Sequence, residues 1–232
     1  MNNHSNESKQ AYGVEHRYVS IALLRRGYEV LRKAPGLENL QHAKEVLQSD
    51  PGPSIHQLHD IFLSIDATID AFCICTAVEC AIKAFLVDEK LVVHSITPGD
   101  DPNLKKLKRQ QKTRPITQSE LLSAGGIPAT ETERIIELVD VQTISLSTML
   151  GSRSYYETAG LSDDLAELLR KTSNRRNIET HYFSIWLGQP LSEIIEMYCK
   201  VKEFIDSCVV GKHNELVDQT GYPASWKIVA AS

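Results

Sequence analysis

The chain is organised around residues 77–86, Ala77-Val78-Glu79-Cys80-Ala81-Ile82-Lys83-Ala84-Phe85-Leu86. Apolar side chains occupy most positions of this stretch, and they continue at helical spacing back towards Ser54 and on to Val87. The run Ser49-Asp50-Pro51-Gly52-Pro53 breaks the chain just before Ser54, whose hydroxyl is suited to cap a helix. A helix that is apolar on much of its circumference is usually a central one. The sequence therefore predicts a long central helix over residues 54–87.

Helical spacing of apolar residues recurs along most of the chain. It predicts further helices over residues 14–33, 37–48, 131–150 and 191–210, and one helix or a pair of them over residues 162–186. Thr117 and Glu120 form a capping box for a short helix that Gly125-Gly126 ends. Period-two alternation, which is typical of half-buried strands, is almost absent. We therefore expect an all-α fold that consists of a single helical bundle domain.

Two polar segments and both ends of the chain lie outside this pattern. Residues 97–115 and 151–160 are expected to form polar inserts. The domain organisation that follows has a disordered N-terminus at residues 1–13, a helical domain at 14–210 with its core at 54–210, and a tail at 211–232. Within this extended C-terminal tail, residues 226–231 are expected to form a short strand or an extended arm.

Composition restricts the classes of protein to which the chain can belong. Its 232 residues carry a net charge of −5, with 42% hydrophobic and 24% charged residues, as in ordinary globular proteins. An acidic chain has no global attraction for nucleic acid, so any RNA contact requires a local basic patch. The first ten residues do not resemble a signal peptide, and no apolar run is long enough to span a bilayer. We expect a cytoplasmic protein without membrane contact.

Cysteine usage supports the same expectation. The five cysteines are an odd number and include no C-x-x-C pair, which argues against a disulfide framework or a zinc site. His56, His59 and Asp60 have a spacing that could bind a metal, but no further ligand accompanies them on the same face. We therefore expect neither a metal nor another cofactor.

The best candidate for chemistry is the segment Arg175-Arg176-Asn177-Ile178-Glu179-Thr180-His181. On a helix, Asn177 and His181 share a face because they are four residues apart, and Asn174 falls on that face as well. Histidine can accept and return a proton near neutral pH, and arginine offers phosphate oxygens a planar fork that stays charged. The set suits metal-independent phosphodiester chemistry. The alternative is a polar helix face that happens to carry a histidine.

Arginine, asparagine, three spacers and histidine on a late helix of an all-α domain resemble the HEPN superfamily. The residues that carry the resemblance are Arg176, Asn177 and His181, with a weaker echo in the acidic-then-lysine helix at 77–86. The resemblance implies a helical endoribonuclease that needs no metal and cuts RNA by 2′-hydroxyl attack. It implies His181 as general base or acid, Arg176 as phosphate stabiliser and Asn177 as orienting group. Arg175 also satisfies the spacing, so the choice between the two arginines stays open.

The resemblance also implies partners. HEPN domains usually form homodimers in which two motifs build one composite active site, and many act on RNA in toxin–antitoxin pairs or antiviral defence. A cognate antitoxin or a regulatory protein is then a further partner. Some members are catalytically silent and act as helical dimers that bind a protein or a nucleotide, which is the alternative function for this chain.

Three further features have both a functional and a structural interpretation. Glu79 either supports the motif arginine or pairs with Lys83, four residues further on. Tyr155 and Tyr156 either stack on bases or anchor a loop. The basic run at 105–114 either binds the RNA backbone or forms a solvated loop. Its residues are Lys105, Lys106, Lys108, Arg109, Lys112 and Arg114.

Overall fold

The structure is a computed structural model. It describes residues 16–34, 42, 45–46, 48, 54, 56–57, 67–182 and 191–229, and for 67–69, 71, 174–182 and 191–194 it describes the backbone alone. The expected disordered N-terminus at 1–13 and most of the expected helix at 37–48 lie outside the described residues. The first half of the expected long helix, residues 54–66, also lies largely outside them.

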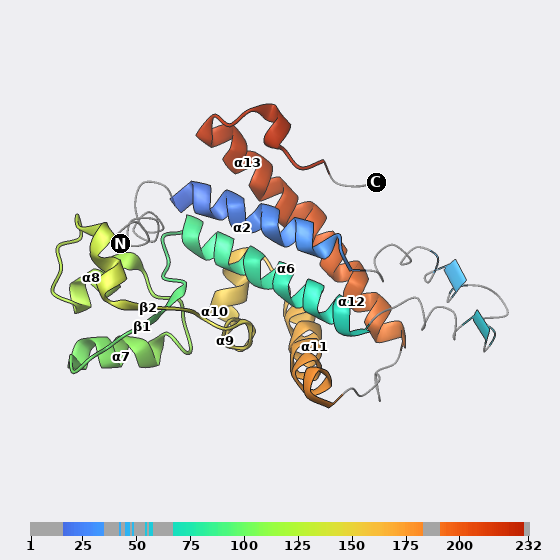
Figure 1. The fold of residues 1–232 in the computed structure, drawn as a ribbon, viewed down its shortest axis with the longest axis horizontal. Helices are drawn as coiled ribbons and strands as arrows, with labels where there is room; N and C mark the ends of the chain where they lie inside the picture. The colour runs from blue at the N-terminus through green and yellow to red at the C-terminus, as the bar shows by residue number, and fades with distance from the viewer. Residues whose placement is uncertain are drawn as a thin grey trace, which may run out of the picture.

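Two helices packed side by side form the centre of the molecule (Figure 1). They are α2 (His16–Leu31) and α6 (Ala67–Asp88), which confirm the helix expected at 14–33 and the described half of the central helix. Their backbones approach closely at Gly27, where an added Cβ would lie 2.9 Å from the carbonyl oxygen of Ala77. Ser20 adds a buried link, because its hydroxyl donates to the carbonyl of Ala84 over 2.9 Å. The apolar stretch at 77–86 is therefore central, as predicted.

A second layer of helices covers α6 on its other side. It consists of α9 (Leu146–Leu150), α10 (Arg153–Tyr156), the 3-10 turn η3 (Glu157–Ala159) and α11 (Asp163–Tyr182). The segment 151–160 is therefore short helical structure and not the polar loop that we expected. The reason is that Tyr155 and Tyr156 are buried, so the segment belongs to the core.

The C-terminal part of the chain is helical well beyond the predicted end at residue 210. A long rod is built from α12 (Leu191–Phe204), a π-helical turn η4 (Ile205–Val209) and α13 (Val210–Thr220), and α13 packs on α2 (Figure 1). After Gly221 comes η5 (Ala224–Trp226), a 3-10 turn that includes the first residue of the strand or extended arm expected at 226–231. Lys227, which follows, has an extended backbone. The prediction of a tail from 211 was wrong because Leu216 and Val217 of α13 are buried in the core.

The segment between α6 and α9 forms a second, smaller core at one end of the molecule (Figure 1). Its elements are β1 (His94–Ile96), α7 (Pro102–Gln110), α8 (Gln118–Ala124), the 3-10 turn η2 (Thr132–Glu137) and β2 (Val139–Thr143). The predicted capping box of α8 is present. Two expectations were wrong here: residues 97–115 are not a polar insert, and 131–150 is not one helix. Leu104 and Leu107 of α7 are buried, which draws this basic segment into the small core.

The strands β1 and β2 form an antiparallel pair in which His94 lies opposite Thr143. The buried side chain of Gln111 lies along the edge of β1 that faces away from β2. Its amide accepts from the N–H of Ile96 over 3.1 Å and donates to the carbonyl of His94 over 2.8 Å. One side chain thus makes the hydrogen bonds that a neighbouring strand would make.

The described residues are mostly helical, which confirms the all-α class apart from this two-stranded ribbon. In the part of the chain that the structure describes, no helix combines the length and apolar character needed to cross a bilayer.

Candidate functional site

The motif segment lies on α11, which runs without a break from Asp163 to Tyr182. Its start follows the predicted signals: the Ser162 hydroxyl accepts from the N–H of Leu165 over 3.3 Å, and acidic residues occupy the first turn. Carboxylates there interact favourably with the positive end of the helix dipole. The prediction that the motif is helical is thus confirmed for the backbone.

The helical register places the motif positions relative to one another. Asn174, Asn177 and His181 fall on one face, since they are separated by three and four residues. Arg176 is displaced from His181 by about 140° around the axis. The side chains of residues 174–182 lie outside the described part of the structure. Their convergence, and the choice between Arg175 and Arg176, remain predictions.

Immediately before the motif, α11 contributes Ser173 to a pocket of about 460 Å³. Ser173 is itself buried, at 4% exposure, so α11 is anchored in the core at this point. The pocket lies where α6, β2, α9 and α11 meet, and six of its seven lining residues are polar. They are Glu79, Gln142, Thr143, Ser145, Ser147 and Ser173, with Leu146 as the apolar member.

One lining residue of this pocket, Glu79, forms an ion pair with Lys83. The ammonium of Lys83 also donates to the Thr143 hydroxyl over 2.7 Å, so it links α6 to the small sheet. The structure therefore confirms the local interpretation of Glu79, in which it pairs with the lysine four residues further on. Support of a motif arginine by Glu79 involves side chains outside the described part.

The imidazole of His94 lies close enough to Lys83 for the two charges to interact. Burial lowers the pKa of His94 below its ordinary value of 6.5, and the positive charge of Lys83 lowers it further. His94 is therefore neutral at neutral pH. Its strand pairs with the one that carries Thr143, so Lys83, Thr143 and His94 form one polar junction between the large core and the small core.

The basic run is a helix and its continuation and not a loop, although most of its basic side chains are solvated, as the loop interpretation held. Helix α7 begins at the Asp101 cap, whose carboxylate accepts from the N–H groups of Asn103 and Leu104. Because Leu104 and Leu107 point into the small core, the basic side chains between and beyond them are exposed. Those exposed residues are Lys105, Lys106, Lys108, Arg109 and Lys112.

Some basic residues of this run form ion pairs with carboxylates, and others do not. Lys105 lies 3.5 Å from the carboxylate of Asp100, and Arg114 makes a 2.8 Å ion pair with Glu120. Among the described residues, no carboxylate forms an ion pair with Lys106, Lys108, Arg109 or Lys112. A surface of unneutralised cations suits phosphate groups. We call these four residues the α7 basic face.

The two tyrosines of the 151–160 segment are structural anchors, which confirms the second of their two interpretations. The Tyr155 hydroxyl donates to the carbonyl of Gln111 over 2.7 Å, and burial raises the pKa of this phenol. The Tyr156 hydroxyl donates to the carboxylate of Asp163 over 2.8 Å. Because both rings are buried, neither offers a face to a base.

A metal site finds no counterpart in the described part of the chain, where no three histidine, cysteine or acidic side chains group as ligands. Of the suggested set, His59 and Asp60 lie outside the described residues. All five cysteines are free thiols.

Comparisons with protein-family models, curated proteins and solved structures found no match to this chain.

The pocket could not be predicted from the sequence. Glu79, Thr143 and Ser173 are far apart along the chain, and ordinary residues of this kind carry no motif. The one available sign was the presence of Lys83 within an apolar helix, since a lysine on a buried face requires a partner.

Proposed function

We propose that this chain is a metal-independent endoribonuclease of the HEPN type. It acts as a homodimer and cleaves RNA through attack of the substrate's own 2′-hydroxyl. The observation that carries the proposal is the continuity of α11 through residue 182. This continuity supports a common face for Asn177 and His181, with Arg176 within reach of it.

Each motif residue has a role that follows from its chemistry. His181 takes the proton from the 2′-hydroxyl or returns one to the leaving 5′-oxygen. Arg176 stabilises the charge that develops on the phosphoryl oxygens, because its planar fork matches them and stays protonated. Asn177, one turn before His181, orients the imidazole or binds a phosphate oxygen. Arg175 and Asn174 support this set from adjacent positions.

The α7 basic face gives the substrate a second point of attachment. Phosphate contacts of this kind position RNA without reading its sequence. The net charge of −5 makes such a local patch necessary, because the chain as a whole does not attract a polyanion. Four exposed cations also make binding sensitive to salt, since each neutralised phosphate releases counterions.

We place this activity in the cytoplasm, in toxin–antitoxin or antiviral defence. A cognate antitoxin or regulatory protein would restrain it. The homodimer sets two copies of the motif across one cleft, so each α11 supplies half of a composite site.

The proposal is tested by incubating purified protein with 5′-labelled single-stranded RNA in the presence of EDTA. Wild type should cut and leave 2′,3′-cyclic phosphate ends. His181→Ala should lose roughly 10²- to 10⁴-fold in rate, the contribution of a general acid or base.

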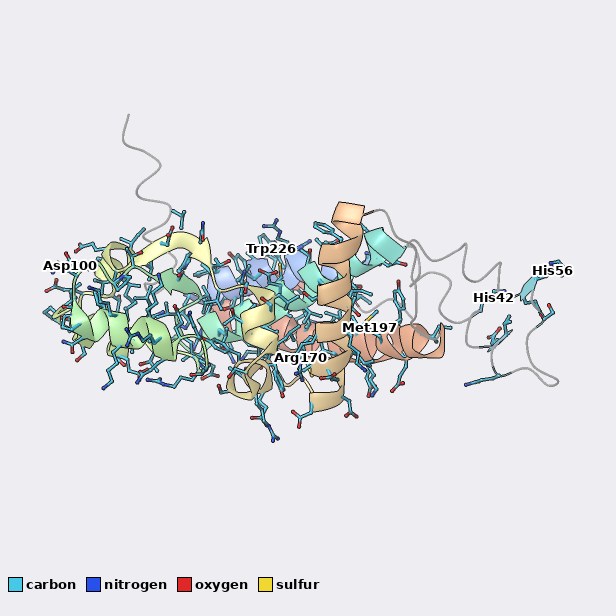
Figure 2. The ribbon with its side chains drawn as sticks, turned by 90° about the horizontal axis from the view of Figure 1, so that it is seen from below. His42, His56, Asp100, Arg170, Met197 and Trp226 are labelled. Carbon is cyan, nitrogen blue, oxygen red and sulfur yellow. The ribbon has the colours of Figure 1, made fainter. Side chains whose placement is uncertain are left out.

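The matched control is His42→Ala. His42 is exposed and lies well away from Arg170 of α11 (Figure 2), so its removal should leave the rate unchanged. Cutting that survives His181→Ala, or that EDTA abolishes, contradicts the proposal. A folded dimer that never turns over RNA supports instead the catalytically silent module that binds a protein or a nucleotide.

A further inference from the structure

The wall of the pocket beside Ser173 includes a carboxylate, that of Glu79. The side chain of Glu79 is 28% exposed, whereas that of its partner Lys83 is only 11% exposed. The carboxylate is therefore the more accessible half of the pair. Lys83 bonds to one oxygen, Oε1, and no other described group donates a hydrogen bond to the carboxylate. An ionised carboxylate has about four acceptor positions, and the described donors fill only part of that capacity.

A hydrogen-bond donor lies next to this acceptor. The Thr143 hydroxyl accepts from Lys83 over 2.7 Å, so its own hydrogen must point elsewhere. Since Thr143 lines the pocket together with Glu79, a ligand bound there can accept this hydrogen. The Lys83 ammonium thus holds the Glu79 carboxylate, an acceptor, next to the Thr143 hydroxyl, a donor, on the pocket wall.

The charges of the wall select against anionic ligands. Glu79 and Lys83 neutralise each other, and the other polar lining residues are hydroxyls and the amide of Gln142. A phosphate would meet the accessible carboxylate and lose its hydration without gaining a free cation from any of the described lining residues. The pocket therefore fits a neutral, flat or compact polar group, and its volume of about 460 Å³ is within the usual range for small-molecule sites.

We propose that this pocket binds a guanine base, with Glu79 as the group that recognises it. Guanine presents two neighbouring N–H donors, N1–H and N2–H, followed by the carbonyl O6. The carboxylate of Glu79 accepts from both donors, and the Thr143 hydroxyl donates to O6. Adenine and cytosine offer the carboxylate an unprotonated ring nitrogen, and uracil lacks the second N–H. Reading of a Watson–Crick edge is the usual way in which proteins recognise single-stranded RNA.

The location of the pocket connects it with the motif helix. Asn177 lies one turn after Ser173 on the same face of α11. In RNA, a base held in the pocket would lie next to a phosphate at the motif, so cleavage would occur beside guanine. This consequence rests on the proposed ribonuclease function, whereas binding of the free nucleotide does not.

The binding test is isothermal titration calorimetry of the full chain with 5′-GMP, AMP, CMP, UMP and ribose 5-phosphate. GMP should bind at least about tenfold more tightly than each of the others, as a bidentate contact provides. Glu79→Gln should weaken GMP binding roughly tenfold to a hundredfold, because one of its two acceptors becomes an amide donor. Glu133→Gln, at an exposed glutamate of η2, is the control and should bind as wild type does.

A second variant keeps the test decisive if Glu79→Gln does not fold. Ser147→Trp places a large ring in the pocket from its exposed rim and leaves the Glu79–Lys83 pair untouched. It should also abolish GMP binding. Equal affinity for the four nucleotides, equal affinity for ribose 5-phosphate, or full GMP affinity in either variant would overturn the proposal.

Cleavage assays separate this proposal from the ribonuclease function. Matched RNAs with and without guanine should differ in rate by tenfold or more, and the difference should vanish in Ser147→Trp. If the chain binds GMP but never cuts RNA, the guanine-site proposal stands and the ribonuclease proposal is wrong. If the chain cuts RNA at the same rate with and without guanine and does not bind GMP, the ribonuclease proposal stands and the guanine-site proposal is wrong.

Discussion

Glu79→Gln should destabilise the fold more than Lys83→Met does, although both substitutions break the same ion pair. The reason is the unequal burial of the two side chains, 28% exposed for Glu79 and 11% for Lys83. Without Glu79, the ammonium loses its counter-charge in a site where water reaches it poorly. Without Lys83, the carboxylate can recover hydration through the pocket, and the methionine still fills the space of the lysine stem.

The size of the effect can be bracketed. Exposed ion pairs contribute about 0–1 kcal/mol, and leaving one partner of a fully buried pair costs about 3–5 kcal/mol. Because this pair lies between those limits, we expect Glu79→Gln to cost about 2 kcal/mol and Lys83→Met to cost less than about 1 kcal/mol. With a urea dependence of about 2 kcal/mol per molar, the unfolding midpoint of Glu79→Gln should fall by about 1 M.

Urea unfolding followed by far-ultraviolet circular dichroism measures both values. The control is Glu196→Gln, which breaks the Glu196–Lys200 pair of the same spacing, whose side chains are 54% and 30% exposed. Its midpoint should shift by less than about 0.3 M, as expected for an exposed helix pair. If Lys83→Met proves as costly as Glu79→Gln, or more so, the burial argument is refuted.

Three other predictions test the packing and the pH dependence of the fold. Burial lowers the pKa of His213 below 6.5, with the charge of Arg25 adding to the effect, so the unfolded chain binds the proton more readily. The free energy of unfolding should therefore fall as pH drops below 6.5, and His213→Gln should flatten that slope in urea titrations at several pH values. Gly27→Val should lower the melting temperature by destabilising the α2–α6 contact by about 2–4 kcal/mol, since even its Cβ would lie 2.9 Å from a backbone oxygen; an unchanged temperature would contradict that contact. Leu104→Ala should cost about 2–4 kcal/mol by leaving a cavity in the small core, while Lys108→Ala on the exposed side of α7 should change stability by less than about 0.5 kcal/mol.

The sequence predicted helix starts and the central helix correctly, because the contacts that determine them lie within a few residues. Ser162 with Asp163, and Thr117 with Glu120, start helices through contacts that span only a few residues. The same holds for the central apolar stretch at 77–86, because a helix that is apolar on most sides has to be buried.

The errors arose where a few buried residues outweighed the composition around them. In α7 the lysines dominate the composition, yet Leu104 and Leu107 determine where the helix packs. In residues 131–150, apolar spacing resembled one helix, but Val141 is 90% exposed and belongs to a strand paired with β1. Neither outcome could be predicted without knowing that a second core exists.

The candidate site likewise has one part that could be predicted from the sequence and one part that could not. The motif on α11 was visible in the sequence because its members lie within a few turns of one helix. The Glu79–Lys83–Thr143 junction was not, because Thr143 reaches it through the strand pairing with His94. Chemistry that is assembled from distant segments becomes visible only after the chain has folded.

The amide of Gln111 has a consequence for the behaviour of the protein at high concentration. Open strand edges invite pairing with other copies, which leads to aggregation. On the outer side of β1, the N–H of Ile96 and the carbonyl of His94 are already occupied by this side chain. A strand from another molecule would have to displace a buried amide before it could pair there. The two-stranded sheet is thus protected on that side against pairing with a further strand.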